Sequence, residues 1–196
     1  MLRRALAVGA VMSVIFAVGA GAEEAEEELP FADARSYIQF GGTNAVENFD
    51  FSSVSADSAV GFNIRWGKRV QPHFSVETQF EYLGDFEMKS GPLRGNPDIY
   101  NVGVNVKGFP LTGRIQPFVV AGFGGTITTS TGDITSIDSS GAGFSTRFGG
   151  GLDLYATESL ALSLEAAYVI PTGEVRNYEH LSVGWSLVYR FASEDE

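Results

Sequence analysis

Two residues near the carboxyl end, His180 and Ser182, have the types and spacing that nucleophilic catalysis uses. Such chemistry needs a serine hydroxyl in hydrogen-bond contact with a histidine, and a carboxylate that orients the histidine. Two residues apart on a strand, both side chains fall on one face, so contact is conceivable. The neighbouring acid, Glu179, points to the other face. We therefore favour a structural role for the pair and assign no catalytic residue.

A larger set of charged residues occupies alternate positions of several predicted strands, with acidic and basic members in equal number. The set is Arg65, Glu77, Glu81, Lys107, Arg147, Asp153, Glu165 and Arg190. A buried charge is costly unless it is paired and hydrogen-bonded. If the hairpins take the register that their turns suggest, Arg65 comes near Glu77, and Arg147 comes diagonally near Glu165. We predict a salt-bridged interior; the alternative is a gated pore whose charges exchange partners.

The strand that carries His180 runs to Phe191 and sets large apolar residues against mostly small or polar ones. Its apolar members are Leu181, Val183, Trp185, Leu187, Tyr189 and Phe191. A period of two over about ten residues indicates a β-strand. About 9–11 residues is also the length that a tilted strand needs to cross a bilayer. Aromatic residues gathered at the strand end are typical of a membrane–water boundary.

The same alternation recurs along the chain. It predicts further strands at residues 35–43, 58–66, 73–83, 98–109, 116–128, 141–155 and 160–170. The strand at 116–128 is the least clear, because Phe118-Val119-Val120-Ala121 is apolar on both faces. Connections after the first, third, fifth and seventh strands are long and polar, at residues 44–57, 84–97, 129–140 and 171–179. The others are short, and the first of them passes through Gly67-Lys68-Arg69.

This asymmetry is typical of outer-membrane barrels, which have an even number of strands, short periplasmic turns and longer outer loops. A soluble barrel would also alternate, but its outer face would be rich in Lys and Glu. Here the polar face is mostly Gly, Ser and Asn, which suits an interior better than a wet surface. We therefore predict an all-β fold, an eight-stranded antiparallel transmembrane β-barrel with short periplasmic turns and long extracellular loops.

The 196 residues are enough for one domain, and the amino terminus has the pattern of a secretory signal peptide. We predict a signal peptide over residues 1–22, an acidic flexible leader over 23–34, the barrel over 35–191 and an acidic tail over 192–196. Without the signal peptide, the chain has 24 acidic and 11 basic residues, which gives a net charge of −13. That balance argues against a nucleic-acid partner. The chain has no cysteine, so it forms no disulfide.

The predicted outer loops are acidic. Their acids are Glu47, Asp50, Asp57, Asp85, Glu87, Asp98, Asp133, Asp138, Glu174 and Glu179, against Lys89, Arg94 and Arg176. Hard cations prefer oxygen ligands, so calcium or magnesium could bridge these loops to lipopolysaccharide phosphates. No loop has the spacing of an EF-hand, and solvated acidic loops are the simpler interpretation. We predict no metal site and no cofactor, and leave open a surface ligand at these loops.

Several motifs resemble the small OmpA/OmpX-like outer-membrane β-barrel family. They are Phe109-Pro110-Leu111, Gln116-Pro117-Phe118-Val119-Val120-Ala121-Gly122-Phe123-Gly124, Arg147-Phe148-Gly149-Gly150-Gly151-Leu152-Asp153 and Leu164-Glu165-Ala166-Ala167-Tyr168. Gly184 with Leu187, Tyr189 and Phe191 is similar to the carboxy-terminal signal that the barrel-insertion machinery reads, although the chain continues to Glu196. The resemblance covers about residues 35–191. It implies location in the outer membrane of a Gram-negative cell envelope, in contact with lipid and lipopolysaccharide.

Taken together, these patterns predict a non-enzymatic outer-membrane protein with a plugged interior and a structural or surface-interaction role. A small gated porin for ions or solutes is the alternative. A lipid-A-modifying enzyme that uses Ser182 and His180 is a third, less favoured hypothesis.

Overall fold

The computed structural model describes residues 30–47, 55–56, 59–84, 88–90, 93–132 and 141–192. The predicted signal peptide, most of the leader and residues 193–196 of the tail lie outside these ranges, as do Asp50, Asp57, Asp85, Glu87, Asp133 and Asp138. Within the described ranges, no helix is long and apolar enough to cross a membrane.

Eight long antiparallel strands form a closed ring. They are β1 (Ser36–Glu47), β3 (Ala59–Gln71), β4 (Phe74–Gly84), β6 (Leu93–Gly108), β7 (Ile115–Gly132), β8 (Gly141–Tyr155), β9 (Leu160–Pro171) and β10 (His180–Arg190). Each strand pairs with its neighbour along the chain, β1 pairs with β10, and the β6–β7 pairing completes the ring. Two short strands, β2 (Ser55–Ala56) and β5 (Met88–Ser90), extend the sheet beyond the rim. The predicted eight-stranded barrel is confirmed.

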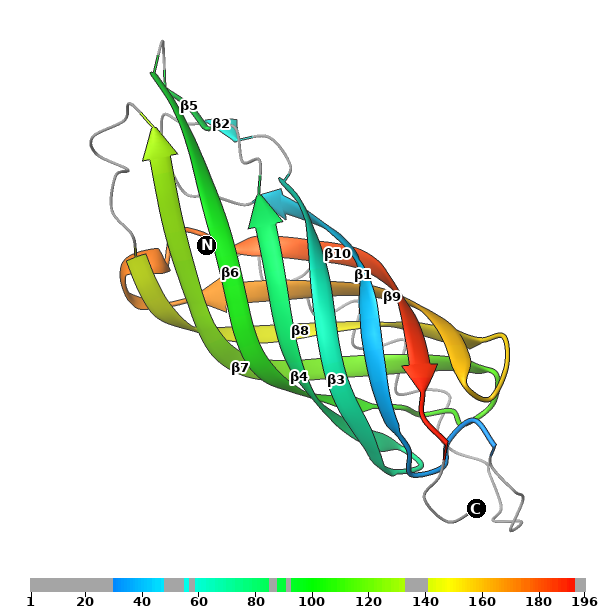
Figure 1. Cartoon of the computed structure of the whole chain (residues 1–196). Helices are drawn as coiled ribbons and strands as arrows, with labels where there is room; N and C mark the ends of the chain where they lie inside the picture. The colour runs from blue at the N-terminus through cyan, green and yellow to red at the C-terminus, as the bar shows by residue number, and fades with distance from the viewer. Residues whose placement is uncertain are drawn as a thin grey trace, which may run out of the picture.

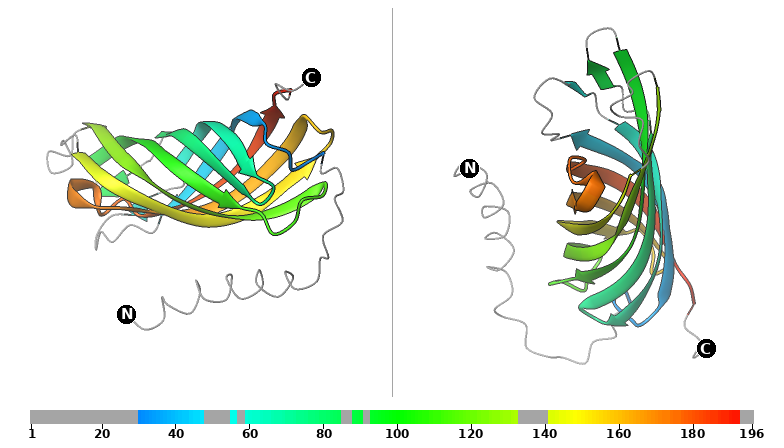
Figure 2. Two further views of the ribbon diagram at one scale, coloured as in Figure 1. Left: turned by 90° about the horizontal axis from the view of Figure 1, so that it is seen from below. Right: turned by 90° about the vertical axis from the view of Figure 1, so that its left-hand side faces the viewer.

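The strands are tilted and wrap around a common axis (Figures 1 and 2). Short turns at residues 72–73, 109–114 and 156–159 gather at one end, together with the start of β1 and the end of β10. We assign this as the periplasmic end, because the short turns of outer-membrane barrels face the periplasm. The strand ends that flank the longer connections lie at the opposite end, assigned as extracellular, where the 3-10 turn η1 (Gly173–Val175) precedes β10.

The predicted turn at Gly67-Lys68-Arg69 is wrong, because β3 continues to Gln71 and only Pro72 and His73 form the turn. The ladder with β1 persists to the pair Ser36–Lys68, which keeps this segment extended. A register irregularity between Arg69 and Gln71 ends the strand. The glycine is required by packing: a Cβ atom at Gly67 would lie 2.3 Å from Cζ of Tyr37.

The predicted loops at 84–97 and 129–140 are also too long, because residues 93–97 and 129–132 continue β6 and β7 beyond the barrel wall. Their register runs on through Gly95–Gly132 and Pro97–Ser130. On the other flank of β6, pairing with β4 ends at Ile99 and pairing with β5 begins at Gly95. Pro97 falls between these two pairings, where its missing N–H group removes no ladder bond.

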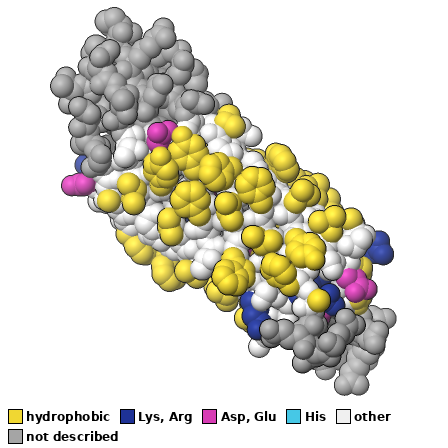
Figure 3. Space-filling model, in the orientation of Figure 1, with side chains coloured by type: hydrophobic (Ala, Val, Ile, Leu, Met, Phe, Trp, Pro, Cys, Tyr) yellow, Lys and Arg dark blue, Asp and Glu magenta, His cyan; other side chains and the backbone are white. Residues whose placement is uncertain are grey.

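The two faces of the wall differ as the alternation predicts. Large apolar side chains point outward and are exposed, up to 68% for Trp66 and 60% for Phe123. On the face in Figure 3, hydrophobic side chains cover the wall, and charged side chains gather towards its ends. Aromatic rings on β3 and β4 contact one another on the outer side of the wall, Phe62 with Phe80 at 6.1 Å and with Tyr82 at 5.7 Å between centroids. This outer surface suits lipid.

The interior is mostly polar but contains two apolar clusters among the described residues. The first consists of Tyr37, Tyr155, Ala161 and Val188, and the second of Phe109, Phe118, Val120 and Ala167. The second cluster explains why part of β7 is apolar on both faces, since Phe118 and Val120 pack inward while Val119 and Ala121 face out.

Candidate functional site: the charged interior of the barrel

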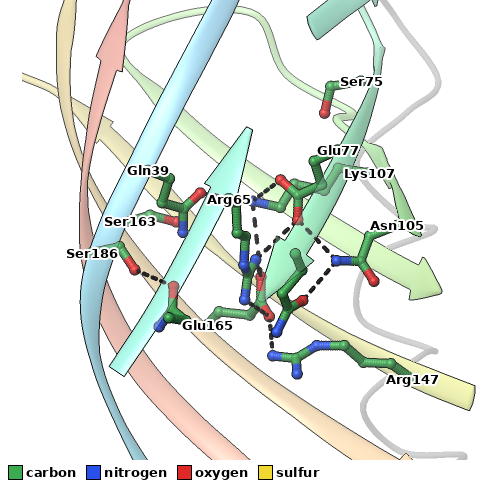
Figure 4. A network of polar contacts seen from close by, with 12 residues as sticks. Gln39, Arg65, Ser75, Glu77, Asn105, Lys107, Arg147, Ser163, Glu165 and Ser186 are labelled. Atoms are coloured by element: carbon green, nitrogen blue, oxygen red, sulfur yellow. Dashed lines mark hydrogen bonds and ion pairs between the residues drawn. The ribbon is translucent and has the colours of Figure 1, made fainter. Parts of the chain in front are cut away.

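Arg65 links strands on opposite sides of the ring. Its guanidinium donates to both carboxylate oxygens of Glu165 on β9, from Nη1 at 2.6 Å and from Nη2 at 2.8 Å. The same Nη1 lies 3.1 Å from Oε1 of Glu77 on β4. In the ring, β4 and β9 face each other across the lumen. Arg65 therefore reaches across the lumen and makes a two-point hydrogen bond that fixes its orientation (Figure 4).

Lys107 on β6 completes the charge balance around Glu77. Its Nζ lies 3.3 Å from Oε2 of Glu77 and 3.8 Å from Oε2 of Glu165, and it sits 4.4 Å from the centroid of the Phe118 ring. Neutral groups satisfy the remaining acceptor sites of Glu77, since the Tyr37 hydroxyl lies 3.0 Å from its Oε2. Each of these charges is at most 7% exposed, so its pairing decides whether burial is tolerated.

Arg147 on β8 extends the network towards the extracellular end. Its Nη2 donates to Glu165 at 2.7 Å, and its Nη1 donates to Oε2 of Glu81 at 3.2 Å. Glu81 also accepts hydrogen bonds from Asn101 Nδ2 at 3.1 Å and from Ser182 Oγ at 2.8 Å. A single connected set of ion pairs thus joins residues on five strands, β3, β4, β6, β8 and β9, and the hydrogen bond from Ser182 links this set to β10.

Two residues of the predicted set are buried but make no ion pair with this network. Asp153 accepts a hydrogen bond from Ser163 Oγ at 2.5 Å, and no salt bridge to it is present among the described residues. Arg190 lies at the periplasmic mouth, where it pairs with Asp33. The register accounts for the position of Arg190, which is opposite Tyr37 at the start of β1, two residues closer to the periplasmic mouth than Gln39, the residue opposite Arg65.

Sequence reasoning missed other members of the interior. Arg69, expected in a turn, is 3% exposed and donates to Pro72 O at 2.6 Å and to Gln116 Oε1 at 2.9 Å. Asn105 bridges Glu77 and Gln79, at 3.3 and 2.7 Å. Asn105 lies at an inward position of the predicted strand, and that position was the only signal that could have identified it.

The predicted nucleophile and base are both buried but are not hydrogen-bonded to each other. The hydroxyl of Ser182 donates to Glu81, whereas Nδ1 of His180 lies 2.9 Å from the carbonyl oxygen of Tyr178. The remaining ring nitrogen of His180, Nε2, has no hydrogen-bond partner among the described residues. The carboxylate of Glu179 accepts a hydrogen bond from Tyr168 at 2.9 Å. This arrangement lacks the Ser–His contact that nucleophilic catalysis needs.

Among the described residues, two cavities are lined in part by interior side chains. The larger, of about 30 Å³, is lined by Gln79, Asn101, Asn105, Ser145 and Arg147, among others. Gln79 Nε2 and Arg147 Nε have no hydrogen-bond partner in the part of the chain that the structure describes. The smaller, of about 10 Å³, lies near the periplasmic end between Arg69, Asp153 and Arg190. Among the described residues, no group of three His, Cys, Asp or Glu side chains is placed to hold a metal ion.

The sequence of residues 8–191 matches a family described as Outer membrane protein beta-barrel domain. This match spans nearly the whole chain. The chain belongs to that family, and it is an outer-membrane β-barrel protein. No curated protein matches it.

Solved structures of small outer-membrane barrels are similar in fold. Ail, the attachment invasion locus protein of Yersinia pestis, in complex with the heparin analogue sucrose octasulfate, has a TM-score of 0.56 at 15% identity, covering 81% of this chain and 99% of that one. Neisserial surface protein A (NspA) has a TM-score of 0.58 at 15% identity, with 80% and 97% covered. OprG from Pseudomonas aeruginosa has a TM-score of 0.52 at 15% identity, with 84% and 99% covered.

At the extracellular end of this outer-membrane barrel, the last loop folds inward. Val175 of η1 is fully buried, and a Cβ atom at Gly143 on β8 would lie 2.5 Å from its Cγ2. Burial also raises the pKa of the Tyr178 phenol in the same loop. The loop before β10 therefore packs into the mouth as well as connecting two strands. A separate contact lies on the rim, where the Tyr82 hydroxyl of β4 donates to Asp98 of β6 at 3.0 Å.

The residues of the expected insertion signal lie on both faces of β10 and just beyond it. Leu187, Tyr189 and Phe191 are 43–54% exposed on the outer surface, and the rings of Tyr189 and Phe191 meet edge to face at 5.5 Å. Gly184 lies on the other face, opposite Thr43 and Glu165 in the two ladders. The outward side chains are thus available at the periplasmic end of the closing strand.

Proposed function

We propose that this outer-membrane barrel is a sealed membrane anchor with a structural or surface-interaction role, and that it carries no catalytic activity. The observation that carries the proposal is the Arg65 guanidinium, which joins Glu77 and Glu165 across the middle of the lumen. An eight-stranded barrel is just wide enough for side chains to fill it. Separating this network would leave buried charges without partners, which is strongly unfavourable.

Packing on either side of the network supports the same proposal. On the periplasmic side, Phe109 and Phe118 form an apolar layer, with ring centroids 5.8 Å apart. On the extracellular side, buried Val175 and nearly buried Tyr178 come from the loop that folds into the mouth. Water and ions would have to displace all three layers to pass.

The surface role would belong to the extracellular loops. Ail of Yersinia pestis is recorded in complex with a sulfated heparin analogue, which is an anionic ligand. The outer loops of this chain are acidic, and the described rim carries Asp98, Glu174 and Glu179 against Arg176. Like charges repel, so we expect a cationic surface ligand, or lipopolysaccharide phosphates bridged by divalent cations.

We propose that residues 1–22 direct export and that Gly184, Leu187, Tyr189 and Phe191 are read by the barrel-insertion machinery.

One observation favours the second candidate, a gated pore. Arg147 borders the cavity of about 30 Å³, and its Nε has no partner among the described residues. The cavity gives this side chain room to move away from Glu81 or Glu165. Exchange of partners there would open the outer half of the lumen.

Single-channel conductance of the refolded mature chain in a planar bilayer separates the two candidates. The sealed barrel is expected to show no discrete steps when the same preparation is demonstrably folded and inserted. Discrete steps that change in Glu165→Gln or Arg147→Gln, but not in the exposed control Glu158→Gln, would replace the sealed anchor by the gated pore.

A further inference from the structure

Residues 30–34, which we call the N-terminal strap, pack against the periplasmic mouth of the barrel. They belong to the leader that the sequence predicts to be flexible, yet Ala32 is fully buried. Arg190 holds the strap from the end of β10: its Nη1 donates to Pro30 O at 3.2 Å, and its Nη2 donates to Asp33 O at 3.0 Å. Arg190 also forms an ion pair with the Asp33 carboxylate.

The aromatic side chain of Phe31 packs the strap against the residues that line the lumen. The ring of Phe31 lies 5.6 Å from the ring of Tyr155, and the guanidinium of Arg114 lies 5.3 Å from the Phe31 centroid. The backbone carbonyl of Phe31 accepts a hydrogen bond from Gln116 Nε2 at 3.0 Å. The strap is therefore bound by residues from β7, β8 and β10 and from the turn before β7, which together surround the mouth.

Beneath the strap lies the apolar cluster of Tyr37, Tyr155, Ala161 and Val188, and Phe31 packs against it. The cavity of about 10 Å³ adjoins this cluster and is also lined by Arg69 and Arg190. None of the strap's described contacts reaches Arg65, Glu77 or Glu165. The layer beneath the strap touches the central network through Tyr37, whose hydroxyl donates to Glu77 at 3.0 Å.

The strap is attached by contacts that can be broken without opening the wall. Ladder hydrogen bonding begins after it, with Arg69 N donating to Arg35 O and Phe191 N donating to Ser36 O. The only backbone–backbone bond in the described part of the strap is local, from Arg35 N to Asp33 O. Segments held by few contacts outside the ladders open locally at lower free energy than the strands do.

We propose that the N-terminal strap is a displaceable lid that closes the periplasmic mouth independently of the central network. When it leaves, the cluster around Ala161 and the guanidinium of Arg190 face the periplasm, while the barrel wall and the ion pairs around Arg65 stay in place. The lid thus controls access from the periplasm to a vestibule that is lined by arginine and tyrosine.

Because the chain has no cysteine, a single thiol behind the lid reports its opening. Ala161→Cys, 1% exposed in the native chain, places a thiol under Phe31, and Ser186→Cys, 3% exposed, places one deeper on β10. The full-length mature chain is reconstituted in vesicles, and the rate of labelling by a membrane-impermeant maleimide is measured. The lid is weakened by Phe31→Ala combined with Asp33→Asn. The matched control is Glu158→Gln, an exposed acid at the same mouth.

We expect slow labelling of the Ala161→Cys chain, about tenfold faster labelling with the weakened lid, and no change with Glu158→Gln, because labelling follows the population of the open lid. The Ser186→Cys thiol should stay slow throughout. Fast labelling at position 161 with the lid intact, or equal rates with and without it, would overturn the proposal. Faster labelling at position 186 would also overturn it, by showing general loosening. Conductance tests the sealed anchor separately, so the two proposals can fail independently.

Discussion

Replacing Glu165 by glutamine perturbs the interior at the described acid with the most ion-pair partners. The native carboxylate accepts hydrogen bonds from Arg65 at 2.6 and 2.8 Å and from Arg147 at 2.7 Å, and Lys107 Nζ lies 3.8 Å away. Glutamine keeps the shape but removes the charge and replaces one acceptor oxygen by a donor. At least one guanidinium N–H group then faces another donor inside a barrel where Arg65 is 2% exposed.

The magnitude follows from the burial of both partners. Removing one member of a buried ion pair costs about 3–5 kcal/mol, because the other charge remains desolvated without compensation. Glu77 still balances Arg65, and Glu81 still balances Arg147, at 3.1 and 3.2 Å. Because these partners remain, we expect the loss of unfolding free energy to lie near the lower end of that range, about 3 kcal/mol.

The assay is reversible unfolding by urea in lipid vesicles, followed by the fluorescence of the two tryptophans, Trp66 and Trp185. Glu158→Gln, the same change at an exposed periplasmic turn, should alter stability by no more than about 0.5 kcal/mol. Adding Arg65→Met to Glu165→Gln should recover part of the loss, because it removes a base that the first change leaves undercompensated. A loss below about 1 kcal/mol for Glu165→Gln would refute the view that these pairs are buried and essential to the folded barrel.

Two further predictions concern the lipid face and the serine near the extracellular end. The side chain of Leu164 is 43% exposed on the outer wall. Leu164→Arg should lower the free energy of unfolding by about 2–4 kcal/mol if the site lies near the bilayer midplane. Leu160→Arg, at the periplasmic end of the same strand, should lower it by only about 0–1 kcal/mol. Equal costs at the two sites would contradict the assigned lipid face. Ser182→Ala should destabilise the barrel by about 1 kcal/mol through the lost hydrogen bond to Glu81. It should leave the mass spectrum of lipid A unchanged, and a mass change that depends on Ser182 would revive the enzyme hypothesis.

Much of the fold can be read from local pattern alone. The alternation in β4 and β9 assigns each side chain to one face, since successive strand residues point to opposite sides. The structure agrees for Glu77 and Glu165 inside and for Leu164 outside. Strand ends were harder to predict, as at Gly67 and Pro97. There, pairing with a neighbouring strand extends β3 and β6 through residues that usually mark turns.

By itself, the sequence predicted a membrane barrel, the apolar and polar faces of its strands, and most of the charged residues that lie inside, but not Arg69. Only the tertiary structure decided how those charges are paired. Arg65 and Glu165 are one hundred residues apart and meet because the ring places β3 and β9 within reach across the lumen. The tertiary structure also placed Arg190 against Asp33, 157 residues away, at the periplasmic mouth. Period-two alternation fixes a face, but contacts across a lumen depend on how the ring closes and how its strands are staggered.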